Sequence, residues 1–395
     1  MSEIDFKIVA VETDFSALAP AWRALSAQQG SPHIHQSFDW QWRAWEHIAR
    51  PLGRKLRLVV GRADGEVVLI WPLVLDGDYL MFLSCEQTEY RDVIVAQDAR
   101  SEGWLNAAWT FVTALPGANC LVLYDVRADA RLAAVVERRA PGRHRRVERR
   151  TFLIDLAQWP DWDAYWAARP KRLVADQRRQ WRRVAERPDA IGFQAAANVA
   201  EAEAWLDWFF AEKLGWLDSR DISTRNFGSP EYREFVRATT QDALARDELL
   251  VGRLGSAETT LSVGFGYGYR GNFIFQSFAY NPADRALSPS RLLLEHLLRW
   301  CFARGIAVFD FLPGEADYKT QWSDRTLAVT DYLVPLTLLG RAKLAWHAGG
   351  MARLVRAPWV RAQFERLPEG LQARLRRSLA ANWDYGADIR RPEDS

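Results

Sequence analysis

A β-strand pattern that occurs twice constrains the fold of this chain more than any other feature of its sequence. The segments Leu56–Glu66 and Glu248–Glu258 each contain an apolar run, the tripeptide Val-Gly-Arg and a glycine-containing turn. An apolar run, a tight turn and a second apolar run predict a β-hairpin. A third strand follows each hairpin, so an antiparallel meander is predicted twice. The second and third predicted strands are Val67–Leu75 and Tyr79–Ser84 in the first copy, and Thr259–Tyr269 and Gly271–Tyr280 in the second.

Helical periodicity flanks both meanders, and each copy ends in one more strand. This repeated order predicts an α/β protein of two tandem units, each with an antiparallel-rich mixed sheet flanked by helices. The predicted domains are residues 1–148 and 149–338, followed by a basic amphipathic helical extension over 339–395. The predicted helices are Phe15–Gln29, Phe38–Ala49, Glu102–Thr113, Trp205–Leu214, Pro230–Arg246 and Pro289–Ala303, and the closing strands are Cys120–Val126 and Ile306–Phe311.

The charge balance and the cysteines narrow the class of protein. Lys and Arg number 52 against 50 Asp and Glu, which argues against nucleic acid as the main partner. Cys85, Cys120 and Cys301 stand far apart without metal-ligand spacing, so we expect a reduced cytoplasmic protein without a structural disulfide or zinc site. The N-terminus lacks a secretory pattern, and no apolar run approaches the roughly 20 residues needed to span a bilayer.

The loop after the last strand of the second unit collects reactive side chains. Asp310 ends the apolar run, a Pro-Gly break follows, and Tyr318, Lys319 and Trp322 come directly afterwards. Loops at strand ends carry much of protein chemistry, so we predict a site here. Asp310 is either a general base, with its pKa altered by the buried run, or a cap that accepts backbone N–H groups. Lys319 is either an oxyanion-stabilising cation or a surface lysine that covers Trp322.

The helix that starts at Pro289 offers a second element of a site. Ser288 is a good N-cap residue and Pro289 suits the first helical turn. A helix N-terminus attracts phosphate because its first N–H groups are unpaired, although most such termini bind nothing.

These residues together resemble a known family. The run from Ala279 to Trp322, with its Ser288-Pro289 pair, Gly314 and Tyr318-Lys319, resembles the C-terminal signature of tandem-GNAT acyltransferases. This group comprises the BioF2-like and cellulose-biosynthesis (CelD-like) acetyltransferases, which are distantly similar to the Fem peptidyltransferases. The first half resembles the group more loosely, in Phe38 with two following tryptophans, in the Trp71-Pro72-Leu73 run and in the Tyr90-Arg91-Asp92 run.

The resemblance implies two GNAT-like domains and acyl-CoA, acetyl or longer, as a co-substrate, with no permanently bound cofactor and no metal. It implies that Lys319 stabilises the oxyanion of the attacked thioester and that the start of the Pro289 helix, with Ser288, Ser290 and Arg291, holds the CoA phosphates. Tyr318 either donates a proton to the leaving thiolate or packs beside the loop. The family usually has glycine where this chain has Ser290, which allows closer approach of the backbone to a pyrophosphate. Trp322 is a predicted substrate contact, and Tyr90 and Asp92 are predicted either to contact the acceptor or to have a purely structural role.

Two basic stretches remain. The segment Arg169–Arg187 carries eight basic residues against two acidic ones, with Leu173, Gln177, Trp181 and Val184 on one helical face. On the opposite face, Arg172 and Arg179 are either solvated or bind CoA phosphates or a polyanionic acceptor. Between Gly340 and Trp383, the sequence contains nine Lys or Arg residues but only two Glu. We predict helices that pack on the body or that touch anionic lipid at the inner face of the membrane.

The predicted function is therefore an acyl-CoA-dependent N-acyltransferase that acts on an amine of a cell-envelope precursor. The acceptor is an amino sugar or exopolysaccharide unit, or an amino lipid such as a sphingoid base. Two alternatives stay open: a Fem-like transferase that uses aminoacyl-tRNA, and a non-catalytic scaffold within a polysaccharide machine.

Overall fold

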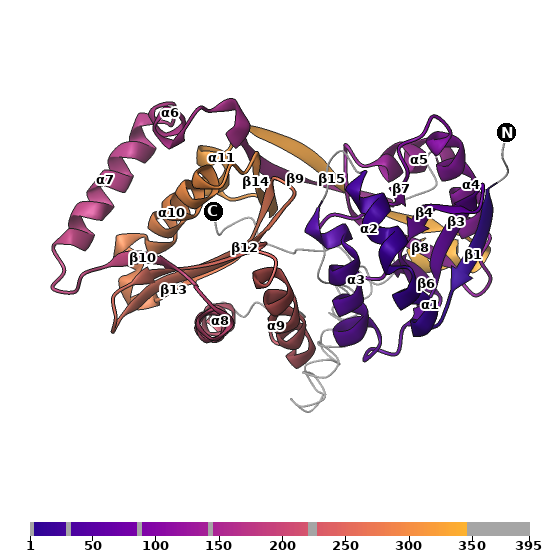
Figure 1. The fold of residues 1–395 in the computed structure, drawn as a ribbon, viewed down its shortest axis with the longest axis horizontal. Helices are drawn as coiled ribbons and strands as arrows, with labels where there is room; N and C mark the ends of the chain where they lie inside the picture. Colours follow the sequence, from indigo (N-terminus) through magenta and orange to yellow (C-terminus); the bar gives the residue numbers. More distant parts are fainter. Residues whose placement is uncertain (1–3, 29–32, 85–88, 141–144, 220–226, 346–395) are drawn as a thin grey trace, which may run out of the picture.

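The computed structural model describes residues 4–28, 33–84, 89–140, 145–219 and 227–345. The chain forms two lobes side by side, with residues 4–140 (the first half) in one lobe and most of residues 145–345 (the second half) in the other (Figure 1). No helix in these ranges is long and apolar enough to cross a membrane.

The first half begins with an edge strand, continues through helices into two hairpins, and ends in a helix, a strand and a helix. Its strands are β1 (Asp5–Val9), β2 (Lys55–Leu56), β3 (Leu58–Ala63), β4 (Glu66–Trp71), β5 (Leu73–Asp76), β6 (Tyr79–Phe82), β7 (Ile94–Val95) and β8 (Cys120–Arg127). Its helices are α1 (Glu12–Ala17), α2 (Ala19–Ala27), η1 (Ile34–Gln36), α3 (Phe38–Ala44), η2 (Trp45–Ala49), α4 (Ser101–Thr113) and α5 (Arg131–Arg139).

The second half repeats this order, with a longer meander. Its strands are β9 (Arg145–Asp155), β10 (Gly192–Ala195), β11 (Leu249–Gly255), β12 (Thr260–Tyr269), β13 (Asn272–Tyr280), β14 (Val308–Pro313) and β15 (Arg325–Pro335). Its helices are η3 (Leu156–Gln158), α6 (Trp162–Ala167), α7 (Lys171–Ala185), α8 (Val199–Asp218), α9 (Pro230–Leu244), η4 (Pro282–Leu287), α10 (Pro289–Ala303), α11 (Asp317–Trp322) and α12 (Leu338–Ala345).

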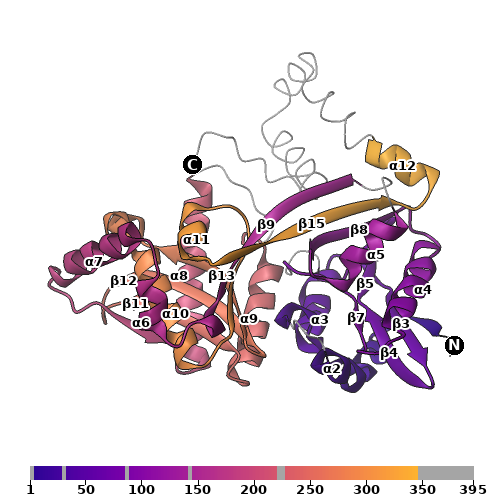
Figure 2. The same cartoon turned by 90° about the horizontal axis from the view of Figure 1, so that it is seen from above.

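One sheet runs through both halves. Its order is β10-β11-β12-β13-β14-β9-β15-β8-β6-β5-β2, and a smaller sheet in the first half has the order β1-β3-β4-β7. The long strands β9 and β15 extend from one lobe to the other (Figure 2), and β15 pairs with β9 on one side and with β8 of the first half on the other. The predicted boundary between residues 148 and 149 therefore falls inside β9.

Three elements predicted as continuous are divided, and one of them, the predicted helix Phe38–Ala49, is α3 followed by η2. The predicted strand Val67–Leu75 is β4 and β5, which lie in different sheets because Pro72 has no N–H to contribute to a ladder. The predicted helix Phe15–Gln29 is α1 and α2, which meet at Leu18. The first meander is thus two hairpins in two sheets, whereas the second, β11-β12-β13, stays in one sheet as predicted.

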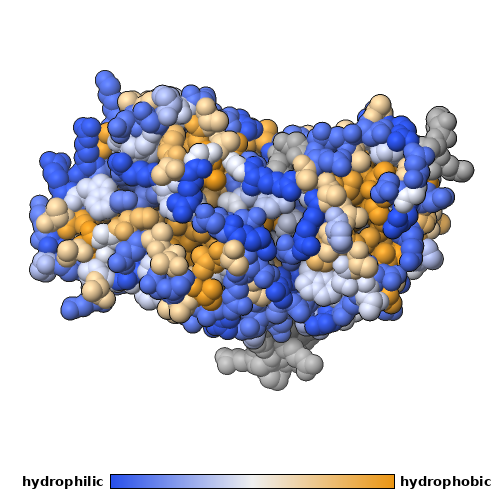
Figure 3. Space-filling view, viewed as in Figure 1, coloured by the Kyte–Doolittle hydropathy of each residue, from blue (hydrophilic) through white to orange (hydrophobic). Residues whose placement is uncertain are grey.

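Apolar packing joins the two halves. Trp40 on α3 meets Phe235 and Tyr267 of the second half edge to face, with ring centroids 5.0 and 5.2 Å apart. Arg43 also binds Asp242 on α9 through two N–H groups, at 2.8 and 3.2 Å. On the face seen in Figure 3, hydrophilic side chains gather where the lobes meet. The halves therefore share a core beneath a polar surface.

Candidate active site

The site forms where two parallel strands of the second half separate. β13 pairs with β14 only through Asn272–Ile274 and Val308–Asp310. Beyond Ile274 no strand of the described chain pairs with β13 on that side, and β14 continues against β9. A cavity of about 490 Å³ lies in this opening, lined by residues 275–280 of β13 and by residues 311–316. The backbone edge of β13 therefore faces the cavity, where an extended ligand can pair with it.

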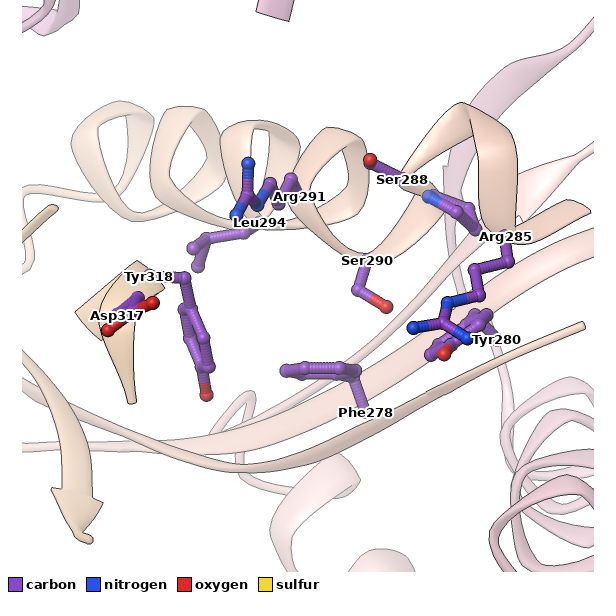
Figure 4. Close-up of a pocket in the computed structure, with 10 residues that line it drawn as sticks. Phe278, Tyr280, Arg285, Ser288, Ser290, Arg291, Leu294, Asp317 and Tyr318 are labelled. Carbon is purple, nitrogen blue, oxygen red and sulfur yellow. The ribbon is translucent and has the colours of Figure 1, made fainter. Parts of the chain in front are cut away.

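A second cavity, of about 400 Å³, adjoins the first and reaches the start of α10. Phe278, Tyr280 and Tyr318 line both cavities, so the two form one continuous site. In Figure 4 the side chains of Arg285 and Ser290 project toward the second cavity, whereas the Ser288 hydroxyl points away.

The start of α10 suits an anion. Pro289 occupies the first position, as predicted. Ser288 occupies the N-cap, as predicted, but its φ is +50°, in the left-handed region, and its side chain makes no capping hydrogen bond, although its carbonyl accepts the Arg291 N–H at 3.0 Å. The Ser290 hydroxyl is buried without a hydrogen-bond partner in the described residues. The positive end of the α10 dipole and the guanidinium groups of Arg285 and Arg291, which line the cavity, together attract phosphate.

Asp310 holds the end of β14 rather than lining either cavity. It is 2% exposed, and its Oδ1 accepts from the Tyr90 hydroxyl at 2.7 Å, the Thr151 hydroxyl at 2.9 Å and the Leu312 N–H at 2.8 Å. Burial raises the pKa of Asp310, while Arg127, 3.6 Å from Oδ2, opposes that rise. Because Leu312 has a φ of +64°, the carboxylate stabilises a turn that would otherwise be strained. Of the two predicted roles, capping is the one that this geometry supports.

Lys319 stabilises the same turn, at Leu312 and Pro313, through hydrogen bonds to its carbonyl groups. Its ammonium donates to the carbonyl oxygens of Leu312 at 3.0 Å and Pro313 at 3.3 Å, and the residue is 8% exposed. It nevertheless lines the cavity between β13 and β14. Lys319 is therefore a fixed positive charge at the wall of the cavity, and the prediction of a surface lysine is wrong.

The two aromatic residues predicted at this loop, Tyr318 and Trp322, lie in different places. Tyr318 lines both cavities, held edge to face between Phe278 and Phe311 at centroid distances of 5.7 and 5.9 Å. Trp322 is fully buried in the core, against Trp166, and lines neither cavity, so its predicted contact with substrate is wrong.

The predicted residues of the first half and of α7 lie away from these cavities. Tyr90 is buried against Asp310. Asp92 accepts the N–H groups of Val93, Arg131 and Leu132 and so caps α5, while burial raises its pKa to about 6. Arg172 and Arg179 are exposed on α7, and neither lines a cavity described above, which leaves the predicted phosphate contact without support. The buried face of α7 was predicted correctly in Leu173, Gln177 and Val184.

The residues of the site that were missed from the sequence include Arg285, Lys213 and Glu89. Arg285 precedes the Ser-Pro pair, so its place beside a predicted phosphate site was a usable signal. Lys213 on α8 and Glu89 of the first half line the cavity between β13 and β14. Burial lowers the pKa of Lys213 to about 8 and raises that of Glu89 to about 7. Glu89 stands directly before the Tyr90-Arg91-Asp92 run, but Lys213 lies within a helix that carries no motif. In the described residues, no cluster of His, Cys, Asp or Glu could hold a metal ion.

Comparisons with known proteins agree with this architecture. Residues 171–320 match the family model described as an acetyltransferase (GNAT) domain. No curated protein matches the chain. Among solved structures, FemX shares the fold with a TM-score of 0.58 and 10% identity, over 85% of this chain and 99% of that one. The C-terminal domain (DUF2156) of a proposed lysylphosphatidylglycerol synthetase from Agrobacterium fabrum has a TM-score of 0.51 and 11% identity, over 84% of this chain and 94% of that one, and a tandem GNAT protein from the clavulanic acid biosynthesis pathway has a TM-score of 0.50 and 14% identity, over 85% of this chain and 99% of that one.

These likenesses confirm the predicted fold class of two tandem GNAT-like units with mixed sheets flanked by helices. The family match supports an acyltransferase. The narrower resemblance to the CelD-like and BioF2-like group stays a prediction, because identities of 10 to 14% carry the fold alone.

Proposed function

We propose that this protein is an acyl-CoA-dependent N-acyltransferase whose reaction takes place between β13 and β14. The separation of these strands after three paired residues carries the proposal, because it opens a slot that leads from an anion-binding helix end to a buried cation. A CoA thioester has this sequence of groups: phosphates at one end, an extended amide-containing arm, and a carbonyl that becomes negative in the reaction.

The donor occupies the site from α10 inward. Its phosphates lie at the N-terminus of α10, where Arg285, Arg291 and the Ser290 hydroxyl face the cavity. Its arm passes Phe278 and Tyr318, which line both cavities, and its amides pair with the open edge of β13. Its thioester then lies in the inner cavity with Lys319.

The chemistry is nucleophilic attack by an amine. The amine nitrogen forms a C–N bond with the thioester carbon, and the carbonyl oxygen becomes an oxyanion that the Lys319 ammonium stabilises. The intermediate collapses as the C–S bond breaks, and the thiolate takes a proton from Tyr318. Lys319 is effective because its two carbonyl contacts hold the charge in place before the reaction begins.

The acceptor belongs to cell-envelope chemistry in this proposal, as an amino sugar, an exopolysaccharide unit or an amino lipid. The sequence resemblance supports this class. The proposed location is cytoplasmic, with contact at the inner face of the membrane. The helical extension that would make this contact was predicted over 339–395, and its residues 346–395 lie outside the described part of the chain.

Release of CoA thiol tests the proposal. Acetyl-CoA and palmitoyl-CoA are each incubated with glucosamine and with sphinganine, and free thiol is followed by colorimetry. We expect at least one pair to turn over, and we expect Lys319→Ala to lower kcat by 100-fold or more. Lys171→Ala, at the exposed start of α7, serves as the matched control and keeps full activity.

The outcomes separate the alternatives. A thermal melt and CoA binding by calorimetry show whether Lys319→Ala still folds. If every pair is silent while aminoacyl-tRNA reacts, the donor class is wrong. CoA binding by the wild type without turnover by any donor supports the scaffold alternative.

A further inference from the structure

We propose that Glu89, contributed by the first half, is the general base that takes the proton from the attacking amine, and that His35 positions it. This inference rests on the proposed function and deepens it, since that reaction releases a proton from nitrogen and Asp310 cannot receive it from the cavity.

Glu89 is the carboxylate that the first half supplies to the cavity of the second. It lines the inner cavity together with Lys319 and with Gln276 of β13. The Gln276 amide donates to Glu89 Oε1 at 3.4 Å. The other two carboxylates at this cavity differ in setting. Glu315 is 68% exposed and held by Arg150 at 2.6 Å, and Glu212 lies on α8.

Oε2 of Glu89 is the oxygen that we assign to accept the proton. Glu89 Oε2 is buried, and no described residue forms a hydrogen bond with it. Buried polar atoms are nearly always paired, so an unpaired carboxylate oxygen beside a cavity indicates a missing ligand. Asp310 Oδ2 is likewise buried without a hydrogen-bond partner in the described residues, but Arg127 lies 3.6 Å from it, three donors occupy Oδ1, and Asp310 lines neither cavity. Glu89 therefore has an open acceptor where the amine arrives.

His35 stands behind this oxygen. Its Nε2 lies 3.9 Å from Glu89 Oε2, the side chain is 0% exposed, and neither ring nitrogen has a hydrogen-bond partner among the described residues. Trp40 holds the ring at a centroid distance of 4.7 Å. Burial lowers the pKa of His35 to about 3, so the imidazole is neutral at physiological pH. The distance is too long for a hydrogen bond in the free protein, and such catalytic contacts commonly tighten when substrate binds.

The charges around Glu89 suit a base that works near neutral pH. Burial raises its pKa to about 7, Asp125 adds to the rise, and Arg91 opposes it. Tyr232 on α9 lies within electrostatic reach of the carboxylate. The remaining titratable groups that share its cavity are Glu212, Lys213, Tyr280, Glu315, Tyr318 and Lys319.

With Glu89 as the base, every proton transferred in the reaction has a donor and an acceptor. As the C–N bond forms, the nitrogen carries an extra proton, which passes to Glu89 Oε2. The C–S bond then breaks and the thiolate is protonated by Tyr318. Glu89 returns its proton to water and Tyr318 regains one, so the products are the amide and the free CoA thiol.

The test is the pH dependence of kcat in wild type and variants. The probe is whichever pair of acetyl-CoA or palmitoyl-CoA with glucosamine or sphinganine releases thiol, with the amine saturating so that protonation of the free acceptor does not contribute. We expect wild-type kcat to fall below about pH 7. Glu89→Gln should lower kcat by 100-fold to 10,000-fold and remove this dependence, with the KM for acyl-CoA within twofold.

Further variants separate a base from a structural residue. Glu89→Asp should restore part of kcat together with the acidic limb. His35→Asn should shift the midpoint of that limb without abolishing it, as a positioning residue does. Glu102→Gln, an exposed substitution of the same kind, should behave as wild type. If Glu89→Gln keeps more than a tenth of kcat, or keeps the acidic limb, Glu89 is not the base. If the wild type releases no thiol with any pair, the proposed function has failed instead.

Discussion

At the scale of single residues, two carboxylates near the site differ in setting: Asp310 is buried behind the cavity wall, whereas Glu89 lines the cavity with 32% of its side chain exposed. Asp310 has three hydrogen-bond donors and a nearby arginine, so its charge is compensated by protein groups. Glu89 has one long contact from Gln276, and its Oε2 is unpaired in the described residues. The contacts of Asp310 stabilise the fold. The unpaired Oε2 of Glu89 lowers the stability of the fold but leaves a hydrogen-bond acceptor for the substrate.

This contrast predicts how stability depends on pH. The folded-state pKa of Glu89, about 7, lies above its usual value of 4.5, so the folded protein binds more protons between these values. The stability that the protonated form supplies is complete below pH 4.5 and is lost as the pH rises through 7. Glu89→Gln removes this loss. We expect the variant to be more stable than wild type at pH 8 by roughly 1–2 kcal/mol, and equal to it near pH 4.5.

Urea unfolding at the two pH values measures this difference. The predicted gain is less than the full shift would give because 32% of the Glu89 side chain is exposed to solvent. Glu102→Gln is the control and should leave stability unchanged at both pH values. A Glu89→Gln variant that is less stable than wild type at pH 8 would show that the carboxylate is compensated after all.

At the scale of elements, the site depends on the divergence of β13 from β14 and on the start of α10. The strand patterns and the bounds of α10, Pro289–Ala303, could be predicted from sequence because periodicity and capping residues are local signals. The divergence could not, since strand register is fixed by tertiary pairing. Trp322 was misplaced for a related reason: its residue type does not show whether an indole lines a groove or fills a core. Glu89 was missed because only the packing of the two halves brings it to the cavity.

The start of α10 yields a prediction about donor binding. Replacing Arg285 or Arg291 by Ala should raise the KM for acyl-CoA about tenfold, because each change removes a charge-assisted contact to phosphate worth roughly 1–2 kcal/mol. The kcat should change little, since neither residue reaches the inner cavity. Arg179→Ala on α7 is the matched control, because this exposed arginine pairs with Asp176 at 3.1 Å and lines neither cavity. If Arg179→Ala raised the KM for acyl-CoA as much as Arg285→Ala does, the phosphates would bind at α7 and not at the start of α10.

At the scale of the whole molecule, the two halves share the larger sheet, and residues of both halves line one cavity. β15 returns from the second half to pair with β8 of the first, and β9 lies between β15 and β14. The duplication could be predicted from the repeated strand pattern, but this exchange of a strand could not, because β15 has no counterpart signal in the repeat. The shared sheet explains how Glu89 of one half reaches a cavity of the other, and it requires that every test use the complete chain.

The claim that the opening between β13 and β14 holds the acyl-CoA donor is tested most directly by hydrogen exchange with and without CoA. We expect CoA to slow exchange of the amides in residues 275–280 of β13 and in the first turn of α10, where the ligand pairs with backbone groups. The amides of α7, Lys171–Ala185, should exchange at the same rate in both samples. Protection confined to α7, or no protection along β13 at saturating CoA, would contradict the account.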